Sequence, residues 1–210
     1  KAVYLQSKSK IINLDVKMDN LLFYEIALTL IPGIGDVNAK KLVAYCGGAE
    51  AVFREKRKNL AKIPGIAERS IESIVSQDSL SRAEKELCFV EKNNIKILYY
   101  LNHDYPKRLK HCYDSPVIIY CKGETDLNVA KVIGVVGTRN VTDYGRYLSD
   151  NIIKELSSDD VMVVSGLAYG VDTCAHKAAL NNELKTVAVL AHGFQTIYPS
   201  ANASLSRKMI

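Results

Sequence analysis

The chain has 210 residues, of which 48% are hydrophobic, so it is long enough for one or two domains with apolar cores. Its formal net charge of +5 is spread thinly along the sequence, which excludes a polycationic arm that would bind nucleic acid by charge alone. The apolar runs are too short to span a membrane, and the five cysteines form no C-x-x-C pair, so we expect a cytoplasmic protein with reduced thiols and no metal site.

Near its start the sequence predicts a loose lead-in followed by a helix. Residues 1–17 scatter lysines among small polar and apolar residues, and we expect them to be loosely held. Asp19 and Asn20 are of the residue types that cap a helix, and apolar side chains over 21–30 recur on one helical face. We therefore predict a helix over 21–30.

A short internal repeat comes next. The sequence IPGIGDVNAKKLV at 31–43 is echoed by IPGIAERSIESIV at 63–75, and each copy indicates a tight turn followed by a helix. This is the pattern of a helix-hairpin-helix, in which glycines permit the turn and leave backbone N–H groups open to a DNA phosphate. The secondary candidates for DNA contact are therefore Gly33, Gly35, Lys40 and Lys41. That the two copies only pack against each other is an equally open alternative.

A longer helix and two strands follow the repeat. Asp78 or Ser79 is expected to cap a helix over 80–91. The apolar stretches at 95–100 and 117–120 predict strands.

Three further strands are predicted to form a parallel sheet. Short apolar runs rich in β-branched residues are typical of strands buried on both faces, and they lie at 132–136, 161–164 and 186–190. They alternate with helix-length segments over 144–158 and 171–181, which gives a βαβαβ order with right-handed crossovers.

These patterns indicate an α/β fold class with two domains. A small all-helical domain with the helix-hairpin-helix repeat is expected over 1–85, and an extended Rossmann-like domain over 95–210. A helix, not a flexible linker, is expected to join them. The parallel sheet looks unfinished at Ile210, so we expect the complete protein to continue it.

Each predicted strand of the parallel sheet ends in glycine or other small residues. The carboxyl ends of such strands and the following helix starts face one crevice, where backbone N–H groups freed by glycine bind anions. Two loops, at 137–145 and 165–170, should therefore meet at one phosphate-seeking surface. Neither contains G-x-G-x-x-G or G-x-x-x-x-G-K-[ST], which disfavours a dinucleotide or nucleoside triphosphate site and implies no cofactor.

A series of ordered blocks runs through this half of the sequence. The blocks are YPKRL at 105–109, SPVIIYCKG at 115–123, VVGTR at 135–139, YGR at 144–146, VVSGLAYGVDTCAHKAAL at 163–180, TVAVL at 186–190 and YPSAN at 198–202. Together they resemble the DNA processing protein A (DprA/Smf) family. The resemblance covers about half the chain, which is far more specific than a single short motif.

The resemblance implies a protein that is not an enzyme, binds single-stranded DNA and loads the RecA recombinase on it during natural transformation. The implied mechanism is phosphate capture at helix starts, with few charges and little sequence preference. The family's dimer surface belongs to a later part of its members, so any homodimer is expected to form there. The residues expected to contact DNA are Gly137, Thr138, Arg139, Ser165, Gly166, Tyr169, Gly170, Gly193 and Asn202.

Some residues of the crevice also have a plain structural interpretation. Arg139 follows a strand, where its guanidinium can reach a phosphate, and we favour that role. Ser165 can donate to a phosphate or to backbone groups, and both roles stay open. Tyr169 stands where the family usually carries arginine, which removes a charge but leaves a ring that can stack on a base. Asp172 is interpreted as a helix cap and His176, one turn later, as structural.

Two other function classes remain as alternatives. One is a nucleotide-processing enzyme, such as a phosphoribohydrolase on a related Rossmann core, but its Pro-Gly-Gly-x-Gly-Thr motif is missing from the sequence. The other is a protein–protein adaptor, for which salt-insensitive function would be the sign. No nucleophile or metal ligand accompanies the crevice residues, so no catalytic set is predicted.

Overall fold

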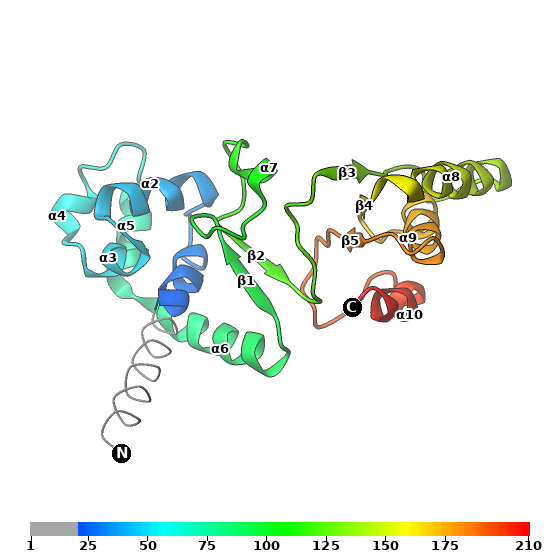
Figure 1. The fold of residues 1–210 in the computed structure, drawn as a ribbon. Coiled ribbons are helices and arrows are strands. Elements are labelled where there is room, and N and C mark those ends of the chain that lie inside the picture. Colours follow the sequence, from blue (N-terminus) through cyan, green and yellow to red (C-terminus); the bar gives the residue numbers. More distant parts are fainter. Residues whose placement is uncertain (1–20) are drawn as a thin grey trace, which may run out of the picture. The chain divides into compact units, whose positions relative to one another are not determined.

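The computed structural model describes residues 21–210, which Figure 1 draws as a coloured ribbon. They fall into two compact units, one that ends at Lys122 and one that spans Gly123–Ile210. The predicted lead-in over 1–17 and the Asp19 and Asn20 cap lie outside the described residues. The domain boundary between 85 and 95 stays a prediction, because it concerns which parts fold on their own.

The first unit is mostly helical. Residues 21–29 form a helix, as the apolar periodicity predicts. The elements that follow are α2 (Asp36–Cys46), α3 (Ala49–Arg54), α4 (Arg57–Leu60), α5 (Glu68–Ser76), α6 (Asp78–Lys92), β1 (Lys96–Tyr99), α7 (Lys107–Lys110) and β2 (Ile118–Cys121). Ile26, Leu42 and Ile71 are among the fully buried side chains of its core.

The two strands of the first unit pair with each other and not with the later strands. β1 and β2 are antiparallel, with Leu98 opposite Ile119. Tyr99 and Val117 are buried in the same apolar cluster as the helices. The segment 96–121 therefore completes the core of the helical unit.

The two copies of the repeat adopt the same turn. Gly33 and Gly65 both have a positive φ, of +76° and +80°, which other residues rarely adopt. In each copy the residue after the glycine donates its N–H to the carbonyl of the residue before the proline. These bonds join Ile34 to Ile31 at 3.2 Å and Ile66 to Ile63 at 3.3 Å. The turn geometry itself thus requires the glycine that the two sequences share.

The start of α6 differs from the prediction. The helix begins at Asp78, and its N-cap residue is Gln77, whose φ is 58°. Capping by Asp78 or Ser79 is wrong, because the chain leaves α5 through a left-handed residue and enters α6 at once. Asp78 lies in the first turn instead, where a negative charge is favourable near the helix N-terminus.

The second unit contains a parallel three-stranded sheet. Its elements are β3 (Lys131–Gly134), α8 (Asp143–Glu155), the 3-10 turn η1 (Leu156–Asp159), β4 (Val161–Ser165), α9 (Val171–Asn181), β5 (Thr186–Ala188), η2 (Ser200–Asn202) and α10 (Ala203–Lys208). The strand order is β3-β4-β5, and both pairs are parallel, as the βαβαβ prediction requires. The protein is thus a mixed α/β fold with a helical amino-terminal part and a Rossmann-like parallel sheet.

Burial in the second unit centres on the middle strand. Val163 of β4 is fully buried, and it packs with Ile153 of α8 and with small alanines of α9 such as Ala178. The flanking strands β3 and β5 are only half-buried, whereas the sequence predicts burial on both faces. Within the described residues these two strands are sheet edges. Val136, just after β3, is 85% exposed.

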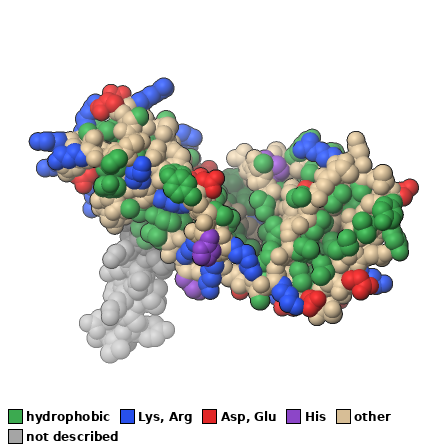
Figure 2. Space-filling view, turned by 90° about the horizontal axis from the view of Figure 1, so that it is seen from above, with side chains coloured by type: hydrophobic (Ala, Val, Ile, Leu, Met, Phe, Trp, Pro, Cys, Tyr) green, Lys and Arg blue, Asp and Glu red, His purple; other side chains and the backbone are tan. Residues whose placement is uncertain are grey.

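The outer face of α8 is also apolar. Tyr144, Leu148 and Ile152 recur every four residues and are all exposed. Figure 2 shows hydrophobic side chains gathered on the face of the second unit that carries α8. The inward face of the same helix supplies the buried Ile153, so α8 presents apolar side chains in two directions.

Candidate functional site

Two loops at the carboxyl ends of β3 and β4 meet, as predicted, and Gly170 lies at their contact. A Cβ atom built on Gly170 would lie 2.1 Å from the carbonyl oxygen of Thr138 and 2.6 Å from that of Arg139. Its φ of +78° also belongs to the region that favours glycine. The neighbouring Val171 donates its N–H to the same Thr138 oxygen at 3.1 Å. The loop after β3 is therefore fastened to the start of α9.

Two of the other three predicted glycines, Gly137 and Gly166, have packing roles in the same contact. A Cβ on Gly137 would lie 2.7 Å from a methyl carbon of Val171, and one on Gly166 would lie 2.8 Å from a carboxylate oxygen of Asp172. Both distances are shorter than real side chains allow. These glycines let the two loops close onto the first turn of α9.

Asp172 occupies the place where the sequence predicts a phosphate. Its Oδ2 accepts hydrogen bonds from the backbone N–H groups of Gly166 at 3.1 Å and Ala168 at 3.2 Å. The carboxylate is buried and lies in the first turn of α9, where negative charge is favourable. Phosphate capture by these two N–H groups is therefore not available, because a side chain of the protein already satisfies them.

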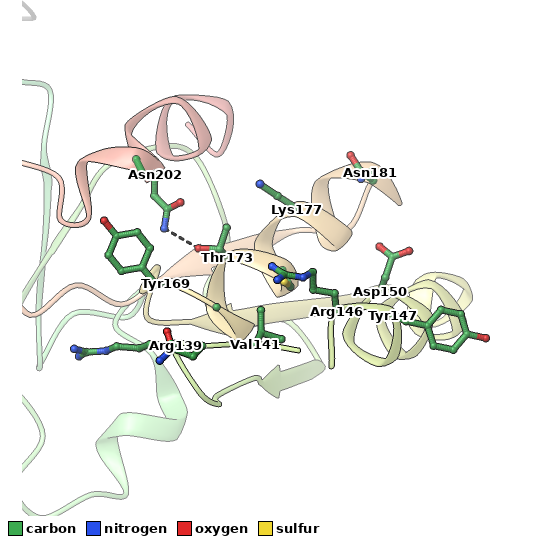
Figure 3. Close-up of a pocket in the computed structure, with 14 residues that line it drawn as sticks. Arg139, Val141, Arg146, Tyr147, Asp150, Tyr169, Thr173, Lys177, Asn181 and Asn202 are labelled. Carbon is green, nitrogen blue, oxygen red and sulfur yellow. Dashed lines mark hydrogen bonds between the residues drawn. The ribbon is translucent and has the colours of Figure 1, made fainter. Parts of the chain in front are cut away.

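Ser165 and Asn202 are hydrogen-bonded within the scaffold. Ser165 donates its hydroxyl to the carbonyl oxygen of Val135 at 2.7 Å, which ties β4 to the end of β3. Asn202 is buried and donates through Nδ2 to the Leu167 carbonyl oxygen and to Thr173 Oγ1, each at 2.8 Å. Figure 3 shows the bond from Asn202 to Thr173. Both residues shape the loop over 166–170.

Two members of the predicted set, Ser165 and Asn202, are buried. The side chains or backbone of four others are exposed to solvent, namely Thr138, Arg139, Tyr169 and Gly193. Arg139 forms no ion pair with any described residue. At the opposite end of the sheet the cations are paired, Lys131 with Asp159 at 2.6 Å and Lys185 with Asp160 at 3.6 Å. The uncompensated positive charge of this strand–loop framework therefore lies at the carboxyl end, where ligands bind to such sheets.

A groove of about 1230 Å³ begins beside these loops and runs between α8 and α9. Its walls carry Arg139, Asn140, Val141, Arg146, Tyr147, Asp150, Tyr169, Gly170, Thr173, Cys174, Lys177, Asn181, Ala201 and Asn202. The sequence prediction includes only the members nearest the loops. It does not include Arg146 and Lys177 among the DNA contacts, although the four-residue spacing from Thr173 to Lys177 on α9 is a usable signal.

The two histidines of the second unit, His176 and His192, both have hydrogen-bond partners within that unit. His176 is fully buried, its Nδ1 lies 2.7 Å from Thr186 Oγ1, and burial lowers its pKa to about 4. It is therefore neutral near pH 7, and the geometry agrees with the structural interpretation. His192 Nε2 accepts the backbone N–H of Tyr198 at 3.2 Å and so braces its own loop.

The secondary candidates belong to the first unit, where both lysines have partners. Lys40 Nζ donates to Ser115 Oγ at 2.6 Å and lies 5.7 Å from the ring centroid of Tyr100. Lys41 Nζ donates to the carbonyl oxygen of Pro64 at 2.8 Å. Gly33 lies in the turn described above, and Gly35 is the N-cap residue of α2 with open space around it.

The described residues also bear on metals and membranes. Over 21–210, no three His, Cys, Asp or Glu side chains gather where they could hold a metal ion. In the same range no helix combines the length and the apolar character needed to cross a bilayer.

Comparison with known proteins identifies relatives of this arrangement. The family model described as DNA recombination-mediator protein A matches residues 96–210. The chain is 37% identical over 124 residues to DNA processing protein DprA of Bacillus subtilis, which covers 59% of this chain and 42% of that protein. It is 30% identical over 186 residues to protein Smf of Synechocystis, with 87% and 47% covered.

A solved structure matches as well. The X-ray structure of DNA processing protein A from Streptococcus pneumoniae aligns with a TM-score of 0.70 and 31% identity, over 88% of this chain and 63% of that one. This chain thus spans about half the length of the curated relatives that it matches.

Proposed function

The chain belongs to the DNA recombination-mediator protein A family, and we propose that its second unit binds single-stranded DNA at the crevice and presents the strand to a RecA recombinase during natural transformation. The observation that carries the binding proposal is the position of Arg139. Its guanidinium has no ion-pair partner among the described residues and stands beside two loops that glycine contacts hold together. An unpaired cation near a strand terminus is suited to a backbone phosphate.

The binding mechanism that we propose uses exposed groups and not the loop amides. Arg139 supplies charge, and the exposed ring of Tyr169 offers a face on which a base can stack. Thr138 lies at the solvent side of the loop after β3, and Gly193 is exposed in the segment after β5. The N–H groups of Gly166 and Ala168 take no part, because Asp172 holds them. Such contacts read the backbone and the base faces, so little sequence preference is expected.

We propose a binding role and not a catalytic one. Asp172 is bonded to loop amides and His176 is buried against Thr186, so neither side chain is placed to exchange a proton with a ligand in the groove. Measurable hydrolysis of a nucleotide that disappears in Arg139→Ala would overturn this part of the proposal and favour the enzyme alternative.

Binding is tested by fluorescence anisotropy with labelled single-stranded and duplex oligonucleotides over a salt series. We expect a preference for the single strand, and Arg139→Ala should weaken binding and flatten the log–log salt slope by about 0.7. Arg139→Lys is the matched control, since it keeps the charge and should retain most of the slope. Unchanged binding by Arg139→Ala, or binding by the wild type that ignores salt, would overturn the crevice as the site.

The hand-over to the recombinase needs its own measurement. The DNA-dependent ATPase of a RecA recombinase, on single strands first coated with a single-strand-binding protein, should rise when this protein is added. Arg139→Ala should reduce that stimulation in proportion to its loss of affinity. A wild type that binds the strand and leaves the ATPase unchanged would contradict the recombinase step alone.

A further inference from the structure

The groove between α8 and α9 suggests a path for the DNA beyond the crevice. We propose that a single strand held at the crevice continues along this groove, where Lys177 and Arg146 bind its phosphates. This inference rests on the proposed function and adds a second contact region to it. The ligand class is a linear polyanion, namely a single-stranded polynucleotide.

One wall of the groove follows a single face of α9. Tyr169, at the loop, is followed at four-residue intervals by Thr173, Lys177 and Asn181, and all four line the groove. The helical part of this wall, from Thr173 to Asn181, spans roughly 12 Å at 1.5 Å per residue, and Tyr169 precedes the helix. An aromatic ring, a hydroxyl, a cation and an amide are thus spread along the groove, which suits an extended strand more than a compact ligand.

The opposite wall comes from α8 and the loop before it. Arg146 and Asp150 lie one turn apart on α8 and both line the groove. Figure 3 shows the side chain of Arg146 extending from α8 and that of Lys177 from α9, while Arg139 points away from both. The groove cations therefore form a site separate from the crevice arginine, at the other end of the same opening.

The groove cations are available to a ligand. Lys177 is exposed and forms no ion pair or side-chain hydrogen bond with any described residue. Among the described residues the Arg146 guanidinium is paired only with Asp143, at 3.3 Å, and both side chains are well exposed. Such a surface pair contributes little and can be exchanged for a phosphate at small cost.

The size of the groove favours a chain over a mononucleotide. Its volume of about 1230 Å³ exceeds the roughly 300–1,000 Å³ typical of small-molecule pockets. A mononucleotide would leave much of this volume filled with water. A strand that tracks a charged groove and stacks some of its bases needs no enclosure.

Asp150 makes the inference sharply testable. Its carboxylate shares the groove wall with Arg146, so it repels any phosphate that passes. If the strand follows the groove, Asp150→Asn should strengthen binding while Lys177→Ala weakens it. A strand confined to the crevice would respond to neither substitution.

The experiment compares oligothymidylates of about 2 and about 20 nucleotides by fluorescence anisotropy over a salt series. For the longer strand, we expect Lys177→Ala to lower affinity about threefold to tenfold and to flatten the salt slope by about 0.7, and Asp150→Asn to raise affinity by a similar factor. For the shorter strand, both variants should match the wild type. Lys154→Ala is the control, since Lys154 is an exposed cation of α8 that does not line the groove.

The outcomes separate this inference from the proposed function. If Arg139→Ala weakens the binding of both strands, and Lys177→Ala lowers the affinity no more than Lys154→Ala does, the crevice remains the binding site and the groove path is overturned. If Lys177→Ala weakens the short strand as much as the long one, Lys177 belongs to the primary contact and the path is also overturned. If the wild type binds neither strand, both proposals fail. Arg146→Ala repeats the test on the other wall, and circular dichroism checks each fold.

Discussion

The Nζ of Lys41 in α2 donates a hydrogen bond to the carbonyl oxygen of Pro64, 2.8 Å away in the second hairpin turn. A contact in the reverse direction joins Ser70 Oγ of α5 to the carbonyl oxygen of Gly33, at 3.4 Å, in the first turn. Each turn is thus bonded to the helix that follows the other one. The repeat packs as a reciprocal pair, and this pairing engages one of the two lysines that the sequence offered to DNA.

Lys40 should matter more for stability than for DNA affinity. Its ammonium bonds the Ser115 hydroxyl at 2.6 Å, across 75 positions of sequence, and joins α2 to the segment before β2. We expect Lys40→Met to lower the free energy of unfolding by about 1–2 kcal/mol in urea titration, because a charged hydrogen bond is lost. Its affinity for single-stranded DNA should stay within twofold of the wild type. Lys62→Met, at an exposed site, should change neither quantity; a large affinity loss in Lys40→Met at unchanged stability would make the hairpin unit a DNA surface.

Gly170→Ala should disable the crevice, whereas Gly193→Ala should be tolerated by the fold. An alanine methyl at 170 would meet the Thr138 carbonyl oxygen at 2.1 Å, so the two loops would have to separate. We expect a stability loss of about 1–3 kcal/mol and a weaker salt dependence of DNA binding. Apart from its chain neighbours, no described residue has an atom within 4 Å of a Cβ built at 193, which makes Gly193→Ala the matched control for thermal unfolding. Equal melting temperatures for the two variants would contradict the close approach.

The two units should respond to pH in opposite directions. Burial raises the pKa of the Glu25 carboxyl from 4.5 to about 7, so its folded state holds a proton that the unfolded state releases. Its contribution to stability therefore falls as the pH rises from about 4.5 to about 7. Burial lowers the pKa of His176 from 6.5 to about 4, against a smaller opposing effect of Asp172. Its contribution is present above about pH 6.5 and is lost as the pH falls towards 4.

Matched variants separate these two contributions. Urea unfolding of Glu25→Gln and His176→Gln is measured between pH 4 and 7.5 and compared with the wild type. Relative to wild type, Glu25→Gln should gain stability as the pH rises, and His176→Gln should gain as it falls. The effect of each group is about 1.4 kcal/mol per unit of pKa difference between the folded and unfolded states. Parallel curves for wild type and a variant would show that the altered group does not titrate as proposed.

Tyr169→Arg should strengthen binding. Tyr169 is exposed next to Gly170, in the loop after β4, at the position where arginine is usual in the family that the sequence resembles. An added cation there should make one more phosphate contact and steepen the salt slope by about 0.7. Tyr169→Leu serves as the comparison, since it removes the ring without adding charge and should weaken binding through lost stacking. No change in slope for Tyr169→Arg would place the strand away from this loop.

The parallel sheet and its helices were predictable because their signals are local. The apolar run at 161–164 lies within β4, and the predicted helix over 171–181 coincides with α9. The left-handed conformation of Gln77 at the start of α6 was not predictable, since among residue types only glycine and asparagine commonly indicate that conformation. The bond between Lys40 and Ser115 was equally hidden, because its partners meet only after the first unit has packed.

The candidate site was half predictable for a related reason. Glycines at strand ends locate the crevice, and Arg139 is exposed there as expected. Whether a loop amide is open depends on side-chain placement, however, and Asp172 was interpreted only as a helix cap. Its carboxylate reaches back to Gly166 and Ala168, which a pattern of residue types does not reveal.

That carboxylate has a kinetic consequence. A loop that waits for a phosphate to organise its amides must lose its ordering entropy during the encounter with DNA, which slows productive association. Here Asp172 performs that organisation when the chain folds, and Asn202 fastens the same loop from the other side. The arriving strand would find a loop already in its final shape, so the flexibility lost on binding would be that of the DNA and of exposed side chains such as Arg139.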